Sequence, residues 1–229
     1  MTMPFYVSPE QLIKDRADFA RKGISRGRAV IVLSCAEGIA FVADNPSDSL
    51  RKIGEIHDRI GFAAVGKYNE FEALRQAGVR WADVRAYAYD RTDVTGRGLA
   101  SIYASLMASG FTAEAKPFEV ELAVAEVGPN AAEDRIFRLG FDGSIMDEET
   151  MVVMGGNQEN IHAALAEQST PQSFSDAIRA AHHALGQPAS IEVAVLKRPA
   201  GEQARHVGYH RCFTRYTAEQ ISTIVKDRS

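Results

Sequence analysis

The sequence has little cysteine, no long apolar run and no excess of positive charge. Only 2 of its 229 residues are cysteine, which excludes a disulfide framework and leaves Cys35 and Cys212 as expected small buried side chains of a cytoplasmic protein. No apolar run approaches the roughly 18 residues that a membrane span needs, and residues 1–7 have no basic segment of a secretory signal. The net charge of −4 offers no footprint for nucleic acid or for an anionic membrane.

Two apolar segments of strand length, residues 29–33 and 39–43, follow each other closely. Between them, Gly38 can take the positive φ that a short connection requires. Because both segments are apolar at nearly every position instead of alternating, we expect strands that are covered on both faces. This hairpin is therefore predicted to lie at the centre of the fold.

A helix is predicted at residues 8–22, near the start of the chain. Ser8 can cap it, Pro9 suits its first position, and Gln11 completes a capping box. Gly23 is expected to follow the last helical residue as the C′ glycine. Charged side chains cover much of this helix, so we expect it at the rim of the domain.

The remaining elements predict the fold class. Further helices are expected at residues 68–77, 94–107, 158–167 and 174–185, and another begins at 217 with a second capping box. Further strands are expected at residues 53–56, 60–65, 117–127, 136–141, 151–154, 191–196 and 205–209. Runs of strands and pairs of helices do not make the strict alternation of a Rossmann sheet. They predict an α+β fold of four layers, an αββα sandwich of two mainly antiparallel sheets, formed as a single domain by residues 8–229.

N-terminal-nucleophile hydrolases have this layering, and their chemistry makes a specific demand on the sequence. A Thr, Ser or Cys must stand as a free N-terminus at the head of the first core strand, helped by a lysine and an aspartate. Here Arg28 and Ala29 occupy that place, although Asp44 and Lys52 are spaced like the helpers. We therefore predict that the chain is not catalytic. The alternative is an active threonine-type peptidase or amidase, released by autocleavage before residue 28.

Other motifs indicate structure instead of chemistry. The segment from Gly96 to Ser101 imitates part of a dinucleotide-binding loop, but no strand runs into it, so an ordinary helix start is predicted. His182 and His183 are adjacent on a predicted helix and point to different faces, which excludes a shared metal. Residues 151–156 are expected to form a buried strand that ends in a tight turn. No cofactor and no metal site is predicted.

Several segments closely resemble the α subunits of actinobacterial 20S proteasomes, from about residue 4 to residue 215. The segments that carry the resemblance are residues 8–11 (SPEQ), 21–24 (RKGI), 41–47 (FVADNPS), 61–71 (GFAAVGKYNEF), 87–97 (YAYDRTDVTGR), 119–126 (EVELAVAE), 142–145 (DGSI), 152–156 (VVMGG) and 191–196 (IEVAVL). The resemblance implies a catalytically silent subunit. Such subunits form heptameric outer rings that cap inner rings of β subunits, template their assembly and admit unfolded protein to the proteolytic chamber.

The resemblance also implies two functional segments. Residues 1–7 carry no capping residue and no helical period, so they are predicted to be a mobile arm. In the family this arm gates the ring pore, and here it comprises Thr2, Met3, Pro4, Phe5, Tyr6, Val7, Ser8 and Pro9. Lys52 matches the family lysine that receives the C-terminal carboxylate of an activator tail, such as that of a hexameric ATPase. Gly23 and Gly66 are expected to help shape this pocket, whereas the alternative for Lys52 is a solvated lysine at a strand end.

Overall fold

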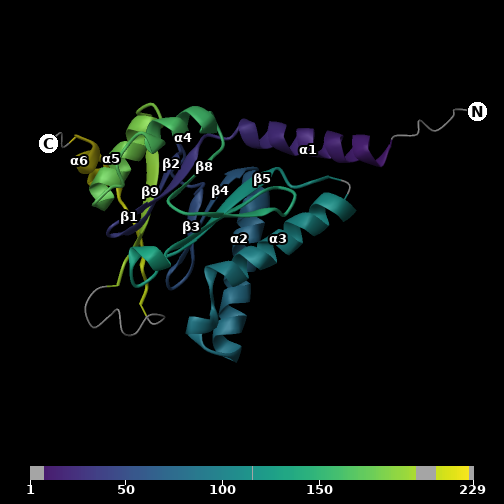
Figure 1. The fold of residues 1–229 in the computed structure, drawn as a ribbon, viewed down its shortest axis with the longest axis horizontal. Coiled ribbons are helices and arrows are strands. Elements are labelled where there is room, and N and C mark those ends of the chain that lie inside the picture. Colours follow the sequence, from purple (N-terminus) through teal and green to yellow (C-terminus); the bar gives the residue numbers. More distant parts are fainter. Residues whose placement is uncertain (1–7, 115, 200–209, 227–229) are drawn as a thin grey trace, which may run out of the picture.

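The computed structural model describes residues 8–114, 116–199 and 210–226, and Figure 1 shows two sheets stacked between helices. The first sheet has the order β10-β9-β2-β1-β8, with bounds β1 (Val30–Cys35), β2 (Gly38–Asp44), β8 (Met151–Met154), β9 (Ile191–Lys197) and β10 (Phe213–Arg215). The second has the order β3-β4-β5-β6-β7, with bounds β3 (Ile53–His57), β4 (Ile60–Gly66), β5 (Val120–Glu126), β6 (Arg135–Leu139) and β7 (Ile145–Glu148). The pairings within both sheets are antiparallel, so the predicted four-layer α+β sandwich is confirmed.

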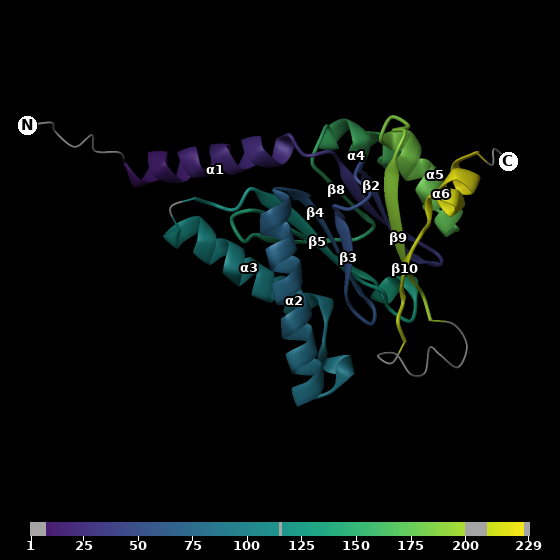
Figure 2. The same cartoon turned by 180° about the vertical axis from the view of Figure 1, so that it is seen from behind.

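Helices cover the outer faces of both sheets (Figures 1 and 2). Their bounds are α1 (Pro9–Ser25), α2 (Tyr68–Ala88), α3 (Gly96–Ala113), α4 (Gln158–Ala166), α5 (Phe174–Ala184) and α6 (Ala218–Lys226), with short 3-10 turns at η1 (Arg91–Asp93) and η2 (Ala131–Glu133). α4 and α5 pack on the first sheet, and α2 and α3 pack on the second. α1 lies along the edge of the sandwich and reaches beyond it (Figure 2).

The central hairpin has apolar residues on both faces because each face belongs to a different core. Val30 and Val32 of β1 lie in the core between the two sheets. Ile31 and Leu33 point the other way, into the core beneath α4 and α5. Successive side chains of a strand alternate between faces, so a strand buried on both sides needs an apolar residue at every position. The central place predicted for this hairpin is confirmed.

A third core lies between the second sheet and the pair α2 and α3. Phe62 of β4 meets Tyr103 of α3 edge to face, with ring centroids 5.8 Å apart. Gly78 lies in the middle of α2, and a Cβ there would stand only 1.9 Å from the Tyr103 hydroxyl. The missing side chain therefore lets α3 approach closely. α2 itself continues to Ala88, beyond the end predicted at residue 77.

The start of α1 confirms one local prediction and corrects two. Ser8 caps the helix, since its Oγ accepts from the Gln11 N–H at 3.2 Å. The predicted capping box is wrong because the Gln11 side chain donates to Asp15 at 2.6 Å instead. The helix continues through Gly23 to Ser25, so Gly23 is not the C′ residue. At the other end of the chain, the second predicted capping box is present.

One strand was missed, and one predicted strand falls on residues that the structure does not describe. β7 was not predicted because three of its four residues are exposed and show no alternation. The strand predicted at residues 205–209 lies outside the described residues, and β10 is found at Phe213–Arg215. The predicted arm of residues 1–7 also lies outside the part of the chain that the structure describes.

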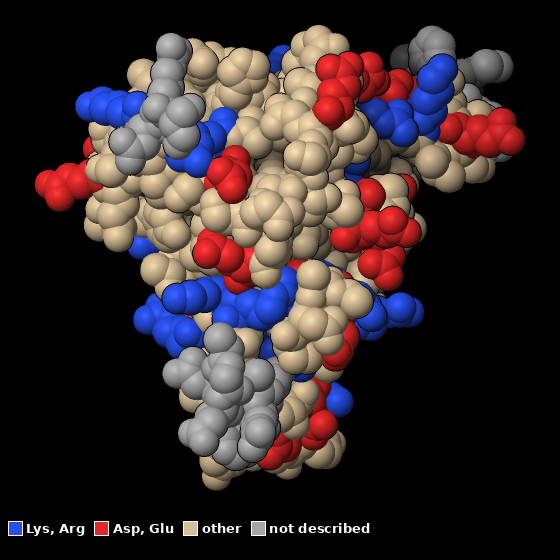
Figure 3. Space-filling view, turned by 60° about the vertical axis from the view of Figure 1, so that its left-hand side comes forward, with Lys and Arg blue, Asp and Glu red and all other residues tan. Residues whose placement is uncertain are grey.

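The surface of the protein carries charges of both signs. On the face shown in Figure 3, basic side chains form a narrow band between groups of acidic ones. No helix within the described ranges is long and apolar enough to cross a membrane. Cys35 and Cys212 are both buried and free, as expected.

Candidate functional site

A crevice of about 510 Å³ opens at the connection between α1 and β1. It is lined by Ser25, Arg26, Gly27, Arg28, Ala29, Asp44, Gly156, Asn157, Asn160, Ile161, Ala184, Leu185 and Gly186. These residues come from the C-terminal end of α1, the adjoining ends of β1, β2 and β8, the start of α4 and the end of α5. The crevice is thus built from segments that are far apart in the sequence.

Lys52, the residue before β3, is not itself among the lining residues, but its side chain binds the backbone of two of them. Its Nζ donates to the carbonyl oxygen of Arg28 at 2.7 Å and to that of Asp44 at 3.0 Å. An ammonium group has three donors, so these two bonds leave one for an incoming acceptor. Lys52 is half-buried, which differs from the freely solvated lysine of the alternative interpretation.

Lys52 is also a cation whose charge is adjusted by its surroundings. Burial lowers its pKa to about 8, while the negative charges of Asp44 and Glu192 oppose this shift and that of Arg28 adds to it. The group therefore stays mostly protonated at neutral pH. A half-buried ammonium with a spare donor is well suited to a carboxylate ligand.

Gly66 and Gly27 lie side by side behind the crevice. Gly66 has a φ of +110°, and a Cβ there would stand 1.9 Å from the Glu119 carbonyl oxygen. A Cβ on Gly27 would stand 3.3 Å from the Gly66 nitrogen, and the Gly27 carbonyl accepts from Gly156 at 2.9 Å. Gly66 is not among the residues that line the crevice, whereas Gly27, which was not predicted from the sequence, is one of them. Its position directly before Arg28, at a helix-to-strand junction, was the available signal.

Gly23 lies one turn earlier on α1 and faces a charged cluster. A Cβ there would stand 2.2 Å from Glu119 Oε2. The Glu119 carboxylate pairs with Lys67 at 2.7 Å and with Lys116 at 3.0 Å. Burial alone would raise the pKa of Glu119, but the hydrogen bonds from these two lysines lower it overall. Gly23 thus sets α1 against this cluster and is not among the residues that line the crevice.

The head of β1 shows what occupies the place of a nucleophile. The backbone runs from α1 through Gly27 into Arg28, so the nitrogen of residue 28 belongs to a peptide bond. The Arg28 guanidinium pairs with the Asp44 carboxylate at 3.1 and 3.2 Å. The aspartate and lysine predicted to assist a nucleophile therefore both contact Arg28: Asp44 binds its guanidinium, and Lys52 binds its carbonyl oxygen. Neither Arg28 nor Ala29 has a hydroxyl or thiol for them to activate.

Other candidate motifs have structural roles. Thr95 caps α3 by accepting from the Gly98 N–H at 3.1 Å, and η1 precedes it, so the predicted helix start is confirmed. Gly155 and Gly156 take positive φ in the turn after β8. Among residues 8–114, 116–199 and 210–226, no group of three or more His, Cys, Asp or Glu side chains is placed to hold a metal ion.

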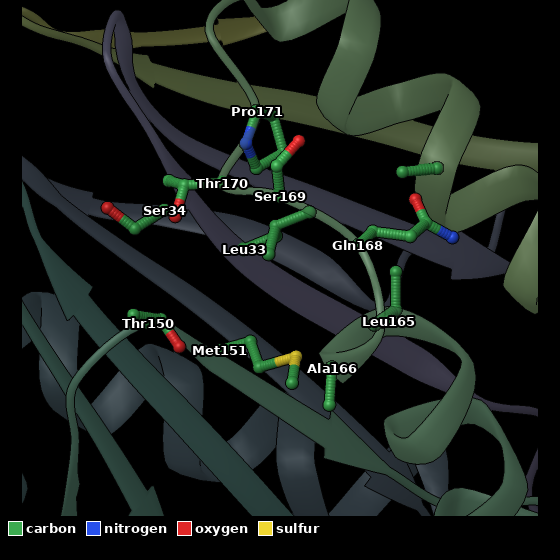
Figure 4. Close-up of a pocket in the computed structure, with 11 residues that line it drawn as sticks. Leu33, Ser34, Thr150, Met151, Leu165, Ala166, Gln168, Ser169, Thr170 and Pro171 are labelled. Carbon is green, nitrogen blue, oxygen red and sulfur yellow. The ribbon is translucent and has the colours of Figure 1, made fainter.

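A second, smaller crevice of about 240 Å³ lies between the β1–β8 edge and the connection from α4 to α5 (Figure 4). Leu33 and Ser34 approach it from β1, Met151 from β8, and Gln168 and Pro171 from the connection. Its lining side chains are all neutral, so they supply no acid, base or ion-pair partner. This crevice therefore offers packing space without evident chemistry.

The predicted gate falls mostly outside this description. Thr2, Met3, Pro4, Phe5, Tyr6 and Val7 lie outside the described residues. Ser8 and Pro9 form the capped start of α1, at the end that extends away from the sandwich.

Comparison with known proteins places this geometry in a family. A family model described as Proteasome subunit matches residues 24–194. "Proteasome subunit alpha" of Arthrobacter sp. (strain FB24) is 60% identical over 235 aligned residues, which cover 98% of each chain. The proteins of the same name from Renibacterium salmoninarum and Kineococcus radiotolerans are 56% and 59% identical, covering 100% and 85% of this chain and 97% and 82% of theirs. The resemblance found in the sequence is confirmed: the chain belongs to the proteasome subunit family and is similar along nearly its whole length to actinobacterial alpha subunits.

Proposed function

We propose that the chain is a non-catalytic subunit of the outer rings of a cytoplasmic 20S proteasome. Seven copies form a ring that templates assembly with β subunits, admits unfolded proteins and docks a hexameric ATPase. The observation that carries the proposal is the head of β1, where neither Arg28 nor Ala29 has a hydroxyl or thiol and the Arg28 guanidinium pairs with the Asp44 carboxylate. The enzyme that cuts the substrate is then the complex, a threonine-type peptidase whose nucleophiles belong to the β subunits. The described geometry gives no support to the alternative of an active nucleophile in this chain.

The proposed gate is the segment from Thr2 to Pro9. Its support is the firm attachment of the helix from which this segment extends. Arg16 of α1 donates to the Phe111 carbonyl at 2.5 Å, and the guanidinium of Arg21 lies 5.6 Å from the centroid of the Phe141 ring. A short arm on a fixed helix can exchange between a closed and an open arrangement without disturbing the domain.

The proposed docking site for the ATPase tails is the crevice above Lys52. A terminal carboxylate would take the spare donor of the Lys52 ammonium, a charge-assisted bond worth about 1.5–3 kcal/mol. Gly66 contributes by letting the backbone pack closely behind Gly27 of the crevice wall, and Gly23 contributes by fixing the position of α1. Because one such bond is weak, several tails of a ring-shaped activator would bind together and gain by multivalency.

Electron microscopy of the chain mixed with the β subunit of the same organism tests the assembly directly. The proposal predicts a stack of four rings with this chain in the two outer rings and sevenfold symmetry. A persistent monomer, or a ring in which this chain lies inside the stack, would contradict it.

A further inference from the structure

Glu192 is a buried carboxylate that lies directly beneath the backbone of Lys52. It belongs to β9, where it pairs with Ala43 of β2, and it is only 4% exposed. Its Oε2 accepts from the backbone N–H of Lys52 at 2.9 Å and from the side-chain amide of Asn45 at 2.8 Å. A buried carboxylate is costly unless its oxygens find donors, and these two donors come from the two ends of one loop.

The second oxygen of Glu192 links the start of β3, in the second sheet, to β10 of the first sheet. Oε1 accepts from the backbone N–H of Ile53 at 3.4 Å and pairs with the guanidinium of Arg215 in β10. Arg215 in turn donates to the carbonyl oxygen of Ile53 at 2.6 Å. Glu192 and Arg215 together therefore hold the backbone on both sides of the Lys52–Ile53 peptide bond.

The loop between Asn45 and Lys52 is closed through this carboxylate. Asn45 also donates to the Leu50 carbonyl at 2.8 Å, and the Asn45 carbonyl accepts from Ser190 at 2.9 Å. Asn45 is itself 5% exposed. The direction in which Lys52 leaves the backbone is thus fixed by contacts to β9, about 140 residues later in the chain, and not by the loop alone.

Glu192 also acts on the charge of Lys52. The ionisable groups that face the ammonium are Asp44 on β2, Arg28 before β1 and Glu192 on β9. Asp44 and Glu192 favour the protonated form, whereas Arg28 and burial oppose it. Removing the negative charge of Glu192 would therefore leave the lysine protonated over a narrower pH range.

We propose that Glu192 is the positioning residue for Lys52: it holds the ammonium at the wall of the crevice, against the carbonyl oxygens of Arg28 and Asp44, and keeps it charged for carboxylate binding. This inference rests on the proposed docking function of Lys52. It adds a second requirement to that site: the buried carboxylate of Glu192 on β9, which acts through Lys52 without contacting the ligand. Arg215 has a supporting part, since it holds the Glu192 carboxylate from the opposite side.

The test uses particles assembled with β subunits and a fluorescent synthetic peptide that copies the C-terminal tail of the ring ATPase. The peptide is made with a free C-terminal carboxylate and as the C-terminal amide, and binding is followed by fluorescence polarisation between about pH 6.5 and 9. The ratio of the two affinities measures the contact with Lys52. In the wild type this ratio should exceed one and should decline as the pH rises through about 8.

Three variants separate the possible outcomes. Lys52→Ala should abolish the preference for the carboxylate at every pH. Glu192→Gln should move the decline to lower pH. If the midpoint falls by about one unit, the preference near pH 7.5 falls about threefold. Asp134→Asn is the matched control: it removes another buried carboxylate with an arginine partner, at the opposite end of the β1–β2 hairpin, and should leave the decline where it is.

Each result bears on a different statement. A wild type without preference for the carboxylate would overturn the docking function itself. If the wild type and Lys52→Ala behave as expected, but the preference in Glu192→Gln declines at the same pH as in the wild type, only the role of Glu192 is overturned. If Glu192→Gln does not assemble, Arg215→Gln decides. It removes the residue that holds the Glu192 carboxylate from the opposite side, so the preference for the carboxylate should fall, and an unchanged preference would overturn the proposal.

Discussion

Arg198 and Asp134 form a two-armed ion pair that joins the two sheets, with Nη1–Oδ1 at 2.7 Å and Nη2–Oδ2 at 2.8 Å. The Asp134 side chain is only 3% exposed. Arg198 also donates to the carbonyl oxygens of Gly128 at 2.9 Å and Ala36 at 3.3 Å. It thus fastens the tip of the β1–β2 hairpin to the loop that precedes β6.

Removing this arginine should destabilise the chain strongly. Arg198→Ala leaves the Asp134 carboxylate buried without its partner, a change that costs about 3–5 kcal/mol. Denaturant unfolding of the purified chain measures the loss. Arg211→Ala is the control, because its pair with Glu55 is exposed and should contribute less than about 1 kcal/mol. Equal losses in the two variants would show that the Arg198 pair does not hold the sheets together.

Removing the Tyr103 hydroxyl, in contrast to removing Arg198, should not destabilise the chain. Tyr103 is fully buried, and its hydroxyl makes no hydrogen bond within the described residues. Burial raises its pKa. Tyr103→Phe should therefore leave the free energy of unfolding unchanged or raise it by up to about 1 kcal/mol, since no bond is lost. Tyr103→Leu, which also removes the ring contact with Phe62, should lower it. A clear loss of stability in Tyr103→Phe would reveal a bonding partner of the hydroxyl.

Lys52 should make the stability of the chain depend on pH in the alkaline range. Its pKa is about 8 in the folded chain against an ordinary 10.5, so between these values the unfolded chain binds a proton that the folded chain has released. Stability therefore rises with pH in this window, relative to a variant that lacks the group. The difference in unfolding free energy between wild type and Lys52→Met should be constant below about pH 8 and shift in favour of the wild type above it. A difference that does not change up to pH 10.5 would contradict the half-buried position of the ammonium.

In activator binding, Lys52→Ala should weaken docking of the ring ATPase while the particle still assembles. Degradation of a tagged substrate by the particle with the ATPase measures docking, and hydrolysis of a small peptide without the ATPase serves as the control for assembly. Normal degradation by Lys52→Ala would remove this lysine from the docking site.

The sequence predicts those features whose cause is local. The continuous apolar runs of β1 and β2 follow from burial on both faces, and Ser8 caps α1 through its own hydroxyl. The spacing of Asp44 and Lys52 in the sequence indicates that they lie close to Arg28, and the structure shows both bonded to it. This is accessible because one hairpin and the loop after it set their positions.

Features that depend on distant contacts are not accessible in this way. The need for a glycine at position 78 of α2 comes from Tyr103, which belongs to another helix. The packing of Gly27 against Gly66 likewise joins two segments that are distant in the sequence. The contact between Lys52 and Glu192 joins the residue before β3 of the second sheet to β9 of the first, so no local pattern marks Glu192 as a partner.

Hydrolysis of a fluorogenic peptide tests the central claim, that this chain controls admission and does not cut. Three preparations are compared: the chain alone, the particle with β subunits, and the same particle after deletion of residues 2–7. The account predicts no turnover by the chain alone, slow turnover by the intact particle and faster turnover after the deletion. Turnover by the chain alone, together with a loss of mass that places a new N-terminus near residue 28, would contradict it.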